Sequence, residues 1–176
     1  MADERESWQG RLALSTAIMA VLAALTTLYM GKFSSRAILA QGQESDQWAY
    51  YQSKSIKEHA FEISRTQLYL QMQAQQALSG EALEAYRTTI AHYEKEIKRY
   101  EDERKKIKSD AEGLASHKLK SQEMGGNFAY ALIFLQIALM LSSISSLTKR
   151  KYLWYLALGA TIGWLFFFTD AWLLFY

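Results

Sequence analysis

Long apolar runs constrain this sequence more than any other feature. Residues 12–30 include 19 consecutive residues without a charge, and two further apolar runs lie toward the C-terminal end. As an α-helix, 19 residues extend over about 28 Å, which is close to the hydrocarbon thickness of a bilayer. The sequence therefore predicts three transmembrane helices, at residues 12–31, 127–148 and 152–176.

A short polar segment, residues 1–11, precedes the first apolar run. A cleaved signal peptide is the alternative to a first transmembrane helix, because it also places an apolar run near the N-terminus. Signal peptides have an apolar core of about 7–15 residues and a basic start. This run is longer and follows acidic residues, so we expect an uncleaved membrane anchor.

Charge is concentrated between the first and second apolar runs. Residues 32–124 hold 15 of the 20 Lys and Arg and 14 of the 18 Asp and Glu. Nearly balanced charges suit a solvated helix surface and argue against a nucleic-acid-binding arm, which would be strongly basic. The chain has no proline, which favours uninterrupted helices. It has no cysteine, so disulfides, thiolate metal sites and Cys nucleophiles are excluded.

Heptad spacing within residues 32–124 predicts a coiled coil. Two apolar series run side by side after residue 80: Leu83, Ile90 and Ile97, and Tyr86, Tyr93 and Tyr100. A third series with the same spacing precedes them: Ala49, Ile56, Ile63 and Leu70. Segments of nearly equal length flank the break between these series, as an antiparallel hairpin requires.

The turn of this hairpin is predicted near residues 79–80. Ser79 can cap the start of a helix, and Gly80 can adopt the left-handed conformation that ends one. Pairing outward from this turn places Leu70 against Ile90 and Ile63 against Ile97, so that apolar residues meet apolar residues. The fold predicted is an all-α membrane protein, with a long antiparallel coiled-coil hairpin between its first and second transmembrane helices.

A cluster of three basic residues, Lys149, Arg150 and Lys151, separates the last two apolar runs. Short loops rich in Lys and Arg remain in the cytoplasm. With three spans, this predicts a cytoplasmic N-terminus and an extracytoplasmic hairpin and C-terminus. The basic residues near the ends of the hairpin carry less weight, because long loops cross largely regardless of charge.

Several segments resemble a known family. They are SDQWAYYQSKSIK at residues 45–57, LALSTAIMAVLAA at 12–24, LQIA at 135–138, and the basic cluster before Leu153-Trp154-Tyr155. Together they are similar to an uncharacterised bacterial membrane protein family, domain of unknown function 4337. The resemblance implies a multi-pass protein of the bacterial inner membrane with this layout, and it supplies no catalytic residues.

Aromatic and glycine residues are candidates for protein contacts. Trp48, Tyr50 and Tyr51 are neighbours in sequence, so they cannot all point to one side of a helix. We expect them to pack between helices or subunits; a recognition patch for a partner protein is the alternative. Gly159 and Gly163 permit close approach of a helix, either within one chain or between subunits.

Polar residues inside the apolar runs are the remaining candidates. Asp170 and Gln136 form a possible intramembrane polar site, since intramembrane carboxylates are costly and often functional. Asp170 is also close to the C-terminus, where an interfacial position would lower that cost. The three histidines are scattered, and no phosphate-binding loop or nucleophile–base pair occurs. We therefore predict no metal, no cofactor and no enzymatic activity.

The leading functional hypothesis is a homo-oligomeric membrane scaffold or accessory subunit, whose hairpin mediates protein–protein contacts. Its expected partners are membrane lipid, other copies of the chain and an unidentified protein, but no nucleic acid. A channel or transporter subunit, with several copies lining a pore, is the alternative. Asp170 and the serines of the second apolar run distinguish the two: a water-filled axis beside them favours transport, and protein around them favours a scaffold.

Overall fold

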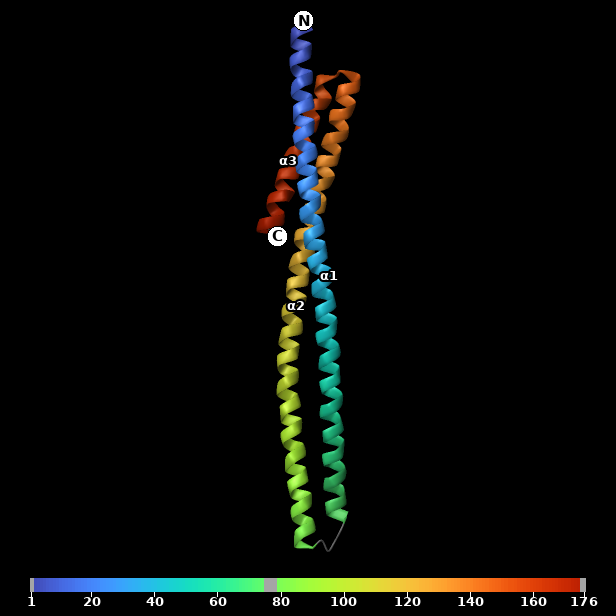
Figure 1. Ribbon diagram of the computed structural model, residues 1–176, viewed down its shortest axis with the longest axis vertical. Coiled ribbons are helices and arrows are strands. Elements are labelled where there is room, and N and C mark those ends of the chain that lie inside the picture. The colour runs from blue at the N-terminus through green and yellow to red at the C-terminus, as the bar shows by residue number, and fades with distance from the viewer. Residues whose placement is uncertain (1, 75–78, 175–176) are drawn as a thin grey trace. The chain divides into compact units, whose positions relative to one another are not determined.

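The described part of the chain forms three α-helices in the computed structural model (Figure 1). These helices are α1, Ala2–Ala74; α2, Gly80–Thr148; and α3, Lys151–Leu173. The structure describes residues 2–74 and 79–174, with side chains from residue 8 onward. Successive helices pack antiparallel, which confirms the predicted all-α fold and its three long helices.

The helices contribute to two compact units. The three-helix unit contains residues 1–39 and 117–176, and the hairpin unit contains residues 40–116. Thus α1 and α2 belong to both units, whereas α3 belongs to the first alone. The predicted turn of the hairpin, near residues 79–80, falls in the second unit, and residues 75–78 just before it lie outside the described residues.

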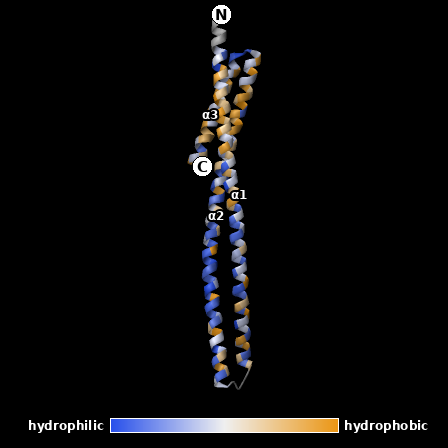
Figure 2. Ribbon diagram, in the orientation of Figure 1, coloured by the Kyte–Doolittle hydropathy of each residue, from blue (hydrophilic) through white to orange (hydrophobic). Residues whose placement is uncertain are grey.

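The three-helix unit is built from apolar stretches (Figure 2). All three helices contain a stretch long and apolar enough to cross a membrane. One cluster of buried residues joins Met19 of α1 to Leu135 and Ala138 of α2 and Ala157 of α3. Most apolar side chains of these stretches nevertheless remain exposed, because three helices cannot enclose one another.

A two-residue turn connects α2 to α3 within the three-helix unit. Lys149 adopts a left-handed conformation with φ of 55°, which is uncommon for a residue with a side chain. The hydroxyl of Ser145 donates a hydrogen bond of 3.0 Å to the carbonyl of Arg150 and so closes the turn. Arg150 then serves as the N-cap residue of α3.

The predicted heptad face of α2 is confirmed in the hairpin unit. Ile90, Tyr100 and Ile107 are each less than 9% exposed, and Ala111 is fully buried. These residues recur at heptad spacing and face α1, as a coiled-coil seam requires. The sequence thus identified the correct contact face on this helix.

The predicted contact face of α1 is wrong. Ile56, Ile63 and Leu70 are 69%, 60% and 61% exposed, so they cannot pack against Ile90 and Ile97. Instead, the ring of Phe61 lies 5.4 Å from that of Tyr93 and 5.8 Å from that of Tyr100.

The physical reason for this difference is the bulk and polarity of the α2 face. Its tyrosines and charged residues are matched by an aromatic and polar face of α1, which includes Tyr51, Glu58 and Phe61. A purely aliphatic face would leave the charges of α2 without partners, which is costly for buried groups.

The start of α2 confirms one of the two predictions about the turn. The Ala82 N–H donates a hydrogen bond of 3.3 Å to the Ser79 hydroxyl, so Ser79 caps the helix. Gly80 does not end α1 in a left-handed conformation. It is the first residue of α2, and none of the described glycines has a positive φ.

Candidate interaction surface

A charged cluster lies between α1 and α2 in the hairpin unit. Arg104 forms an ion pair of 2.6 Å with Glu58, which is 7% exposed. The same guanidinium donates a hydrogen bond of 2.7 Å to the Tyr51 hydroxyl and lies 4.7 Å from the centre of that ring. These contacts raise the pKa of Arg104, with the hydrogen bond to Glu58 as the main cause. Two residues of α1, Glu58 and Tyr51, therefore fix the position of the Arg104 guanidinium.

A second ion pair joins the helices beside the first. Lys54 of α1 lies 2.6 Å from Glu103 of α2. Hydrogen bonding to Lys54 lowers the pKa of Glu103, and the same bond raises the pKa of Lys54. The ammonium group also lies 5.3 Å from the ring centre of Tyr100. Both helices therefore contribute charge of both signs to one side of the seam.

Sequence reasoning found only part of this cluster. It predicted a solvated helix surface of balanced charge, and α2 carries pairs of Lys105 with Glu101 and of Arg99 with Glu96 along its own surface. It missed the pairs between helices. The available signal was Arg104 itself, which lies seven residues after Ile97 and seven before Ala111, on the inward heptad face. A charge at such a position requires a partner from the opposite helix.

An apolar row lies on the opposite side of α1, facing away from α2. We call it the outer stripe, and it consists of Ala49, Ile56, Ile63 and Leu70. All four residues are exposed. Four positions after each lies a small or uncharged polar residue that is also exposed: Ser53, Ala60, Gln67 and Ala74. The two rows alternate at intervals of four and three residues, which is the pattern of a coiled-coil face.

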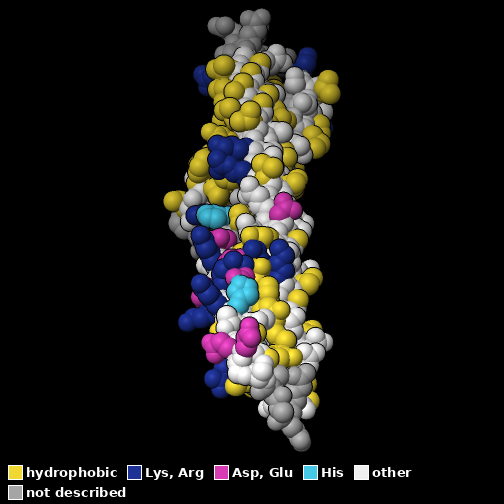
Figure 3. Space-filling model, turned by 60° about the horizontal axis from the view of Figure 1, so that its bottom comes forward, with side chains coloured by type: hydrophobic (Ala, Val, Ile, Leu, Met, Phe, Trp, Pro, Cys, Tyr) yellow, Lys and Arg dark blue, Asp and Glu magenta, His cyan; other side chains and the backbone are white. Residues whose placement is uncertain are grey.

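The outward face of α2 has a different character. Its exposed residues are mostly charged and include Glu94, Lys98, Glu101, Lys105, Lys108 and Glu112. Figure 3 shows charged side chains gathered along one side of the hairpin, with hydrophobic side chains beside them. The apolar outer surface of the hairpin unit is therefore concentrated on α1.

The three aromatic candidates divide between two environments. Trp48 and Tyr51 are half-buried, with ring centres 5.6 Å apart, and Tyr51 belongs to the charged cluster. Tyr50 is exposed, and the Lys54 ammonium lies 5.1 Å from its ring centre. Contacts within one chain therefore account for Trp48 and Tyr51, whereas Tyr50 remains available at the surface.

The two glycine candidates also differ. A Cβ atom at Gly163 would lie 2.6 Å from the ring of Phe134, so this glycine lets α3 approach α2 in the same chain. A Cβ atom at Gly159 would meet no atom within 4 Å. Packing within the chain thus explains the missing side chain of Gly163 but not that of Gly159.

The polar candidates of the three-helix unit lie apart from one another. Asp170 is fully buried, and its carboxylate accepts a hydrogen bond of 2.6 Å from the side-chain amide of Asn127. Asp170 of α3 is therefore packed against α2 of the same chain, and its interfacial depth in a membrane stays a prediction. Gln136 is exposed on α2. Ser142 and Ser145 are buried. An open pocket of about 460 Å³ is lined by Ser142, Ser143 and Ser146 together with Gln9 and Thr16.

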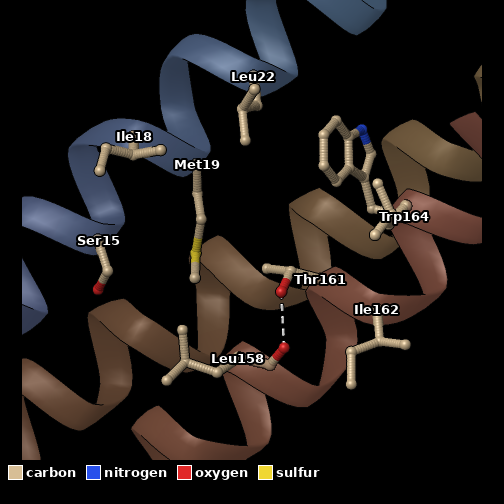
Figure 4. Close-up of a pocket in the computed structure, with 9 residues that line it drawn as sticks. Ser15, Ile18, Met19, Leu22, Leu158, Thr161, Ile162 and Trp164 are labelled. Atoms are coloured by element: carbon tan, nitrogen blue, oxygen red, sulfur yellow. Dashed lines mark hydrogen bonds between the residues drawn. The ribbon is translucent and has the colours of Figure 1, made fainter.

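An apolar pocket of about 270 Å³ lies between α1 and α3 (Figure 4). Met19 and Leu22 of α1 face Leu158 and Trp164 of α3 across it. The Thr161 hydroxyl in its wall donates to the Leu158 carbonyl of its own helix, so it is not directed at a ligand. The pocket therefore has the character of an open, lipid-compatible groove.

Among residues 8–74 and 79–174, no group of three His, Asp or Glu is placed to hold a metal ion. His59 instead contacts Glu62 at 2.8 Å.

Comparison with curated proteins and with solved structures gave no match. The sequence pattern of one family, DUF4337, matches residues 8–174 and thus covers both units. The resemblance noted from residues 12–24, 45–57 and 135–138 is thereby confirmed. The chain belongs to the DUF4337 family, a domain of unknown function.

Proposed function

We propose that this protein is a membrane-anchored scaffold or accessory subunit that assembles into homo-oligomers through its hairpin. Three apolar helices would anchor the chain in a bacterial inner membrane. The hairpin would lie outside the cytoplasm as an antiparallel coiled coil. The basic turn at residues 149–151 supports this orientation, because positively charged short loops remain on the cytoplasmic side.

The observation that carries the proposal is the outer stripe. The hairpin unit already closes its own seam through residues such as Tyr100 and Ile107, yet Ile56, Ile63 and Leu70 remain exposed. A contiguous exposed apolar surface normally marks a site of protein contact. Lipid cannot cover it if the hairpin lies outside the bilayer, so another protein surface is the best-supported occupant.

The buried polar residues support this role over that of a pore subunit. In the single chain, the Asp170 carboxylate does not face an open space, because it is buried and accepts a hydrogen bond from Asn127. Ser142 and Ser145 are likewise buried, and the Ser145 hydroxyl is used in the turn to α3. Contacts within the chain therefore occupy Asp170 and Ser145, whereas Gln136, Ser143 and Ser146 are exposed.

The proposal is tested by changing the stripe and measuring the mass of the particle. The variant Ile56→Glu/Ile63→Glu places two charges on the stripe, and burying them in an interface would be costly. The matched control, Ala91→Glu/Ser109→Glu, adds the same charges to exposed positions of α2. Size-exclusion chromatography with light scattering in mild detergent should give several copies for wild type and control, but one copy for the stripe variant. A single-copy wild-type particle would overturn the proposal.

A further inference from the structure

We infer that the partner of the outer stripe is the outer stripe of a second copy, with the two α1 helices parallel and in register. The inference rests on the proposed function and specifies its contact. Ile56 would then meet Ile56, Ile63 would meet Ile63, and Leu70 would meet Leu70. The occupant follows from four features of the stripe and its surroundings.

The first feature is direction. All copies of a membrane protein are inserted with the same orientation, which the distribution of Lys and Arg sets. Two copies in one bilayer therefore present their α1 helices in the same direction. Parallel pairing is then the arrangement available to two stripes, and identical residues lie at the same level.

The second feature is shape. Large residues of the stripe alternate with smaller ones, as Ala60 lies between Ile56 and Ile63. In a parallel pair in register, each residue of the stripe lies opposite the same residue of the second copy. The two isoleucine layers are then separated by a layer formed by Ala60. Isoleucine is one of the residues that form the packed layers at the a and d positions of coiled coils. Two identical stripes in register therefore place large residues against large ones and small residues against small ones along their whole length.

The third feature is charge. The residues on the two sides of the stripe are mostly uncharged: Gln52, His59 and Thr66 on one side, and Lys57, Ser64 and Gln71 on the other. An identical copy brings identical charges, so a strongly charged border would repel it. The mixed-charge face of α2 would suit a charged partner, whereas this border tolerates a second copy. Gln67, within the alternating row, carries an amide that can donate to and accept from another Gln67.

The fourth feature is area. The stripe extends over about 32 Å from Ala49 to Leu70, and a width of about 10 Å gives roughly 300 Å² per copy. Stable interfaces between soluble proteins bury about 800 Å² per partner. The stripe alone is therefore too small for a soluble partner but sufficient for copies already anchored together. Within the three-helix unit, α1 also exposes small residues that permit close approach of spans: Ala13, Ala17, Ala20 and Ala24.

Single cysteines test this contact, since the natural chain has none. In isolated membranes, Ile56→Cys and Leu70→Cys should each form a cross-linked dimer with a short bis-maleimide. A mixture of tagged Ile56→Cys and untagged Leu70→Cys chains should give no mixed product, which antiparallel pairing would produce. Lys105→Cys, on the charged face of α2, is the control and should remain uncross-linked. Introducing Ile63→Glu should abolish the Leu70→Cys product while helicity, measured by circular dichroism, stays unchanged.

Two results would overturn the inference, and they have different consequences for the proposed function. Cysteines that fail to cross-link but are protected from a soluble maleimide would indicate a different protein on the stripe. The scaffold proposal would then survive with a different partner. Cysteines that fail to cross-link and are freely labelled would show an uncovered stripe, and both proposals would fall.

Discussion

Arg104 occupies a position where an apolar residue is usual, and its contacts show how that is tolerated. The side chain reaches Glu58 and Tyr51, so its charge and several of its donors have partners on α1. A buried ion pair adds little stability over an apolar pair of similar size, but an unpaired buried charge is strongly destabilising. The pair therefore specifies which face of α1 meets α2 more than it strengthens the hairpin.

Replacing Glu58 alone should therefore lower the free energy of unfolding more than replacing both Glu58 and Arg104. We expect Glu58→Leu to lower the free energy of unfolding by about 1–3 kcal/mol, because it leaves Arg104 without its carboxylate. Adding Arg104→Leu should restore most of that loss. Chemical unfolding followed by circular dichroism measures both. The control is Glu101→Leu, at an exposed pair along α2, with an expected change within about 0.5 kcal/mol. Equal losses for the two glutamates would contradict this account.

The pair of Lys54 and Glu103 predicts a dependence of stability on pH. Its hydrogen bond lowers the pKa of Glu103 in the folded chain below the ordinary value of 4.5. The stabilisation is then fully present above pH 4.5 and is lost as the pH falls through the lowered value. The melting temperature of wild type should exceed that of Glu103→Gln at neutral pH, and the difference should disappear in strong acid. A constant difference across this range would exclude the assignment to Glu103.

Helix α1 carries two faces with heptad spacing, and this is why its packing could not be predicted from apolar residues alone. The series Ile56, Ile63 and Leu70 is more apolar than the series through Tyr51 and Glu58. Hydrophobic pattern therefore selects the first as the inner seam, whereas the structure places the second there. The charge of Arg104 decides between them, because it requires Glu58. Helix α2 has only one apolar face with heptad spacing, and its opposite face is charged. Its contact face could therefore be predicted from the apolar residues.

The same limit applies to the candidate sites. Sequence identified the stripe residues, the aromatics near Tyr51 and both glycines, but not the surface to which each belongs. Whether Gly159 or Gly163 contacts the same chain depends on the rotation of α3 about its axis. The spacing of small residues identifies the face of α3 that can approach another helix closely, but not which helix lies there. The neighbour of Gly163 is Phe134, 29 positions away in sequence on another helix.

The two glycines of α3 give a matched pair of variants. Gly163→Leu should disrupt the packing of α3 on α2 and lower the melting temperature, because even a Cβ atom collides with the Phe134 ring. Gly159→Leu should leave the melting temperature of the single chain unchanged, since nothing lies within 4 Å of that position. Differential scanning fluorimetry in detergent measures both. A larger loss for Gly159→Leu would mean that α3 is rotated from the arrangement described.

At the scale of the whole molecule, charge and hydropathy predict more than individual contacts do. Uninterrupted helices follow from the absence of proline, and their antiparallel order follows from nearly equal arms around Ser79. Apolar runs of span length determine where a membrane can lie. The direction of the chain through that membrane depends on a few charges, and Lys149, Arg150 and Lys151 form the densest short cluster of them.

This cluster predicts the topology, and single cysteines can test it. Ser79 directly precedes α2 and Thr148 is its last residue; both are exposed, and they are expected on opposite sides of the membrane. In intact spheroplasts, a membrane-impermeant maleimide should label Ser79→Cys but not Thr148→Cys. Permeabilised cells are the control, and both variants should react there because both positions are exposed. Labelling of Thr148→Cys alone in intact spheroplasts would invert the orientation and place the outer stripe in the cytoplasm.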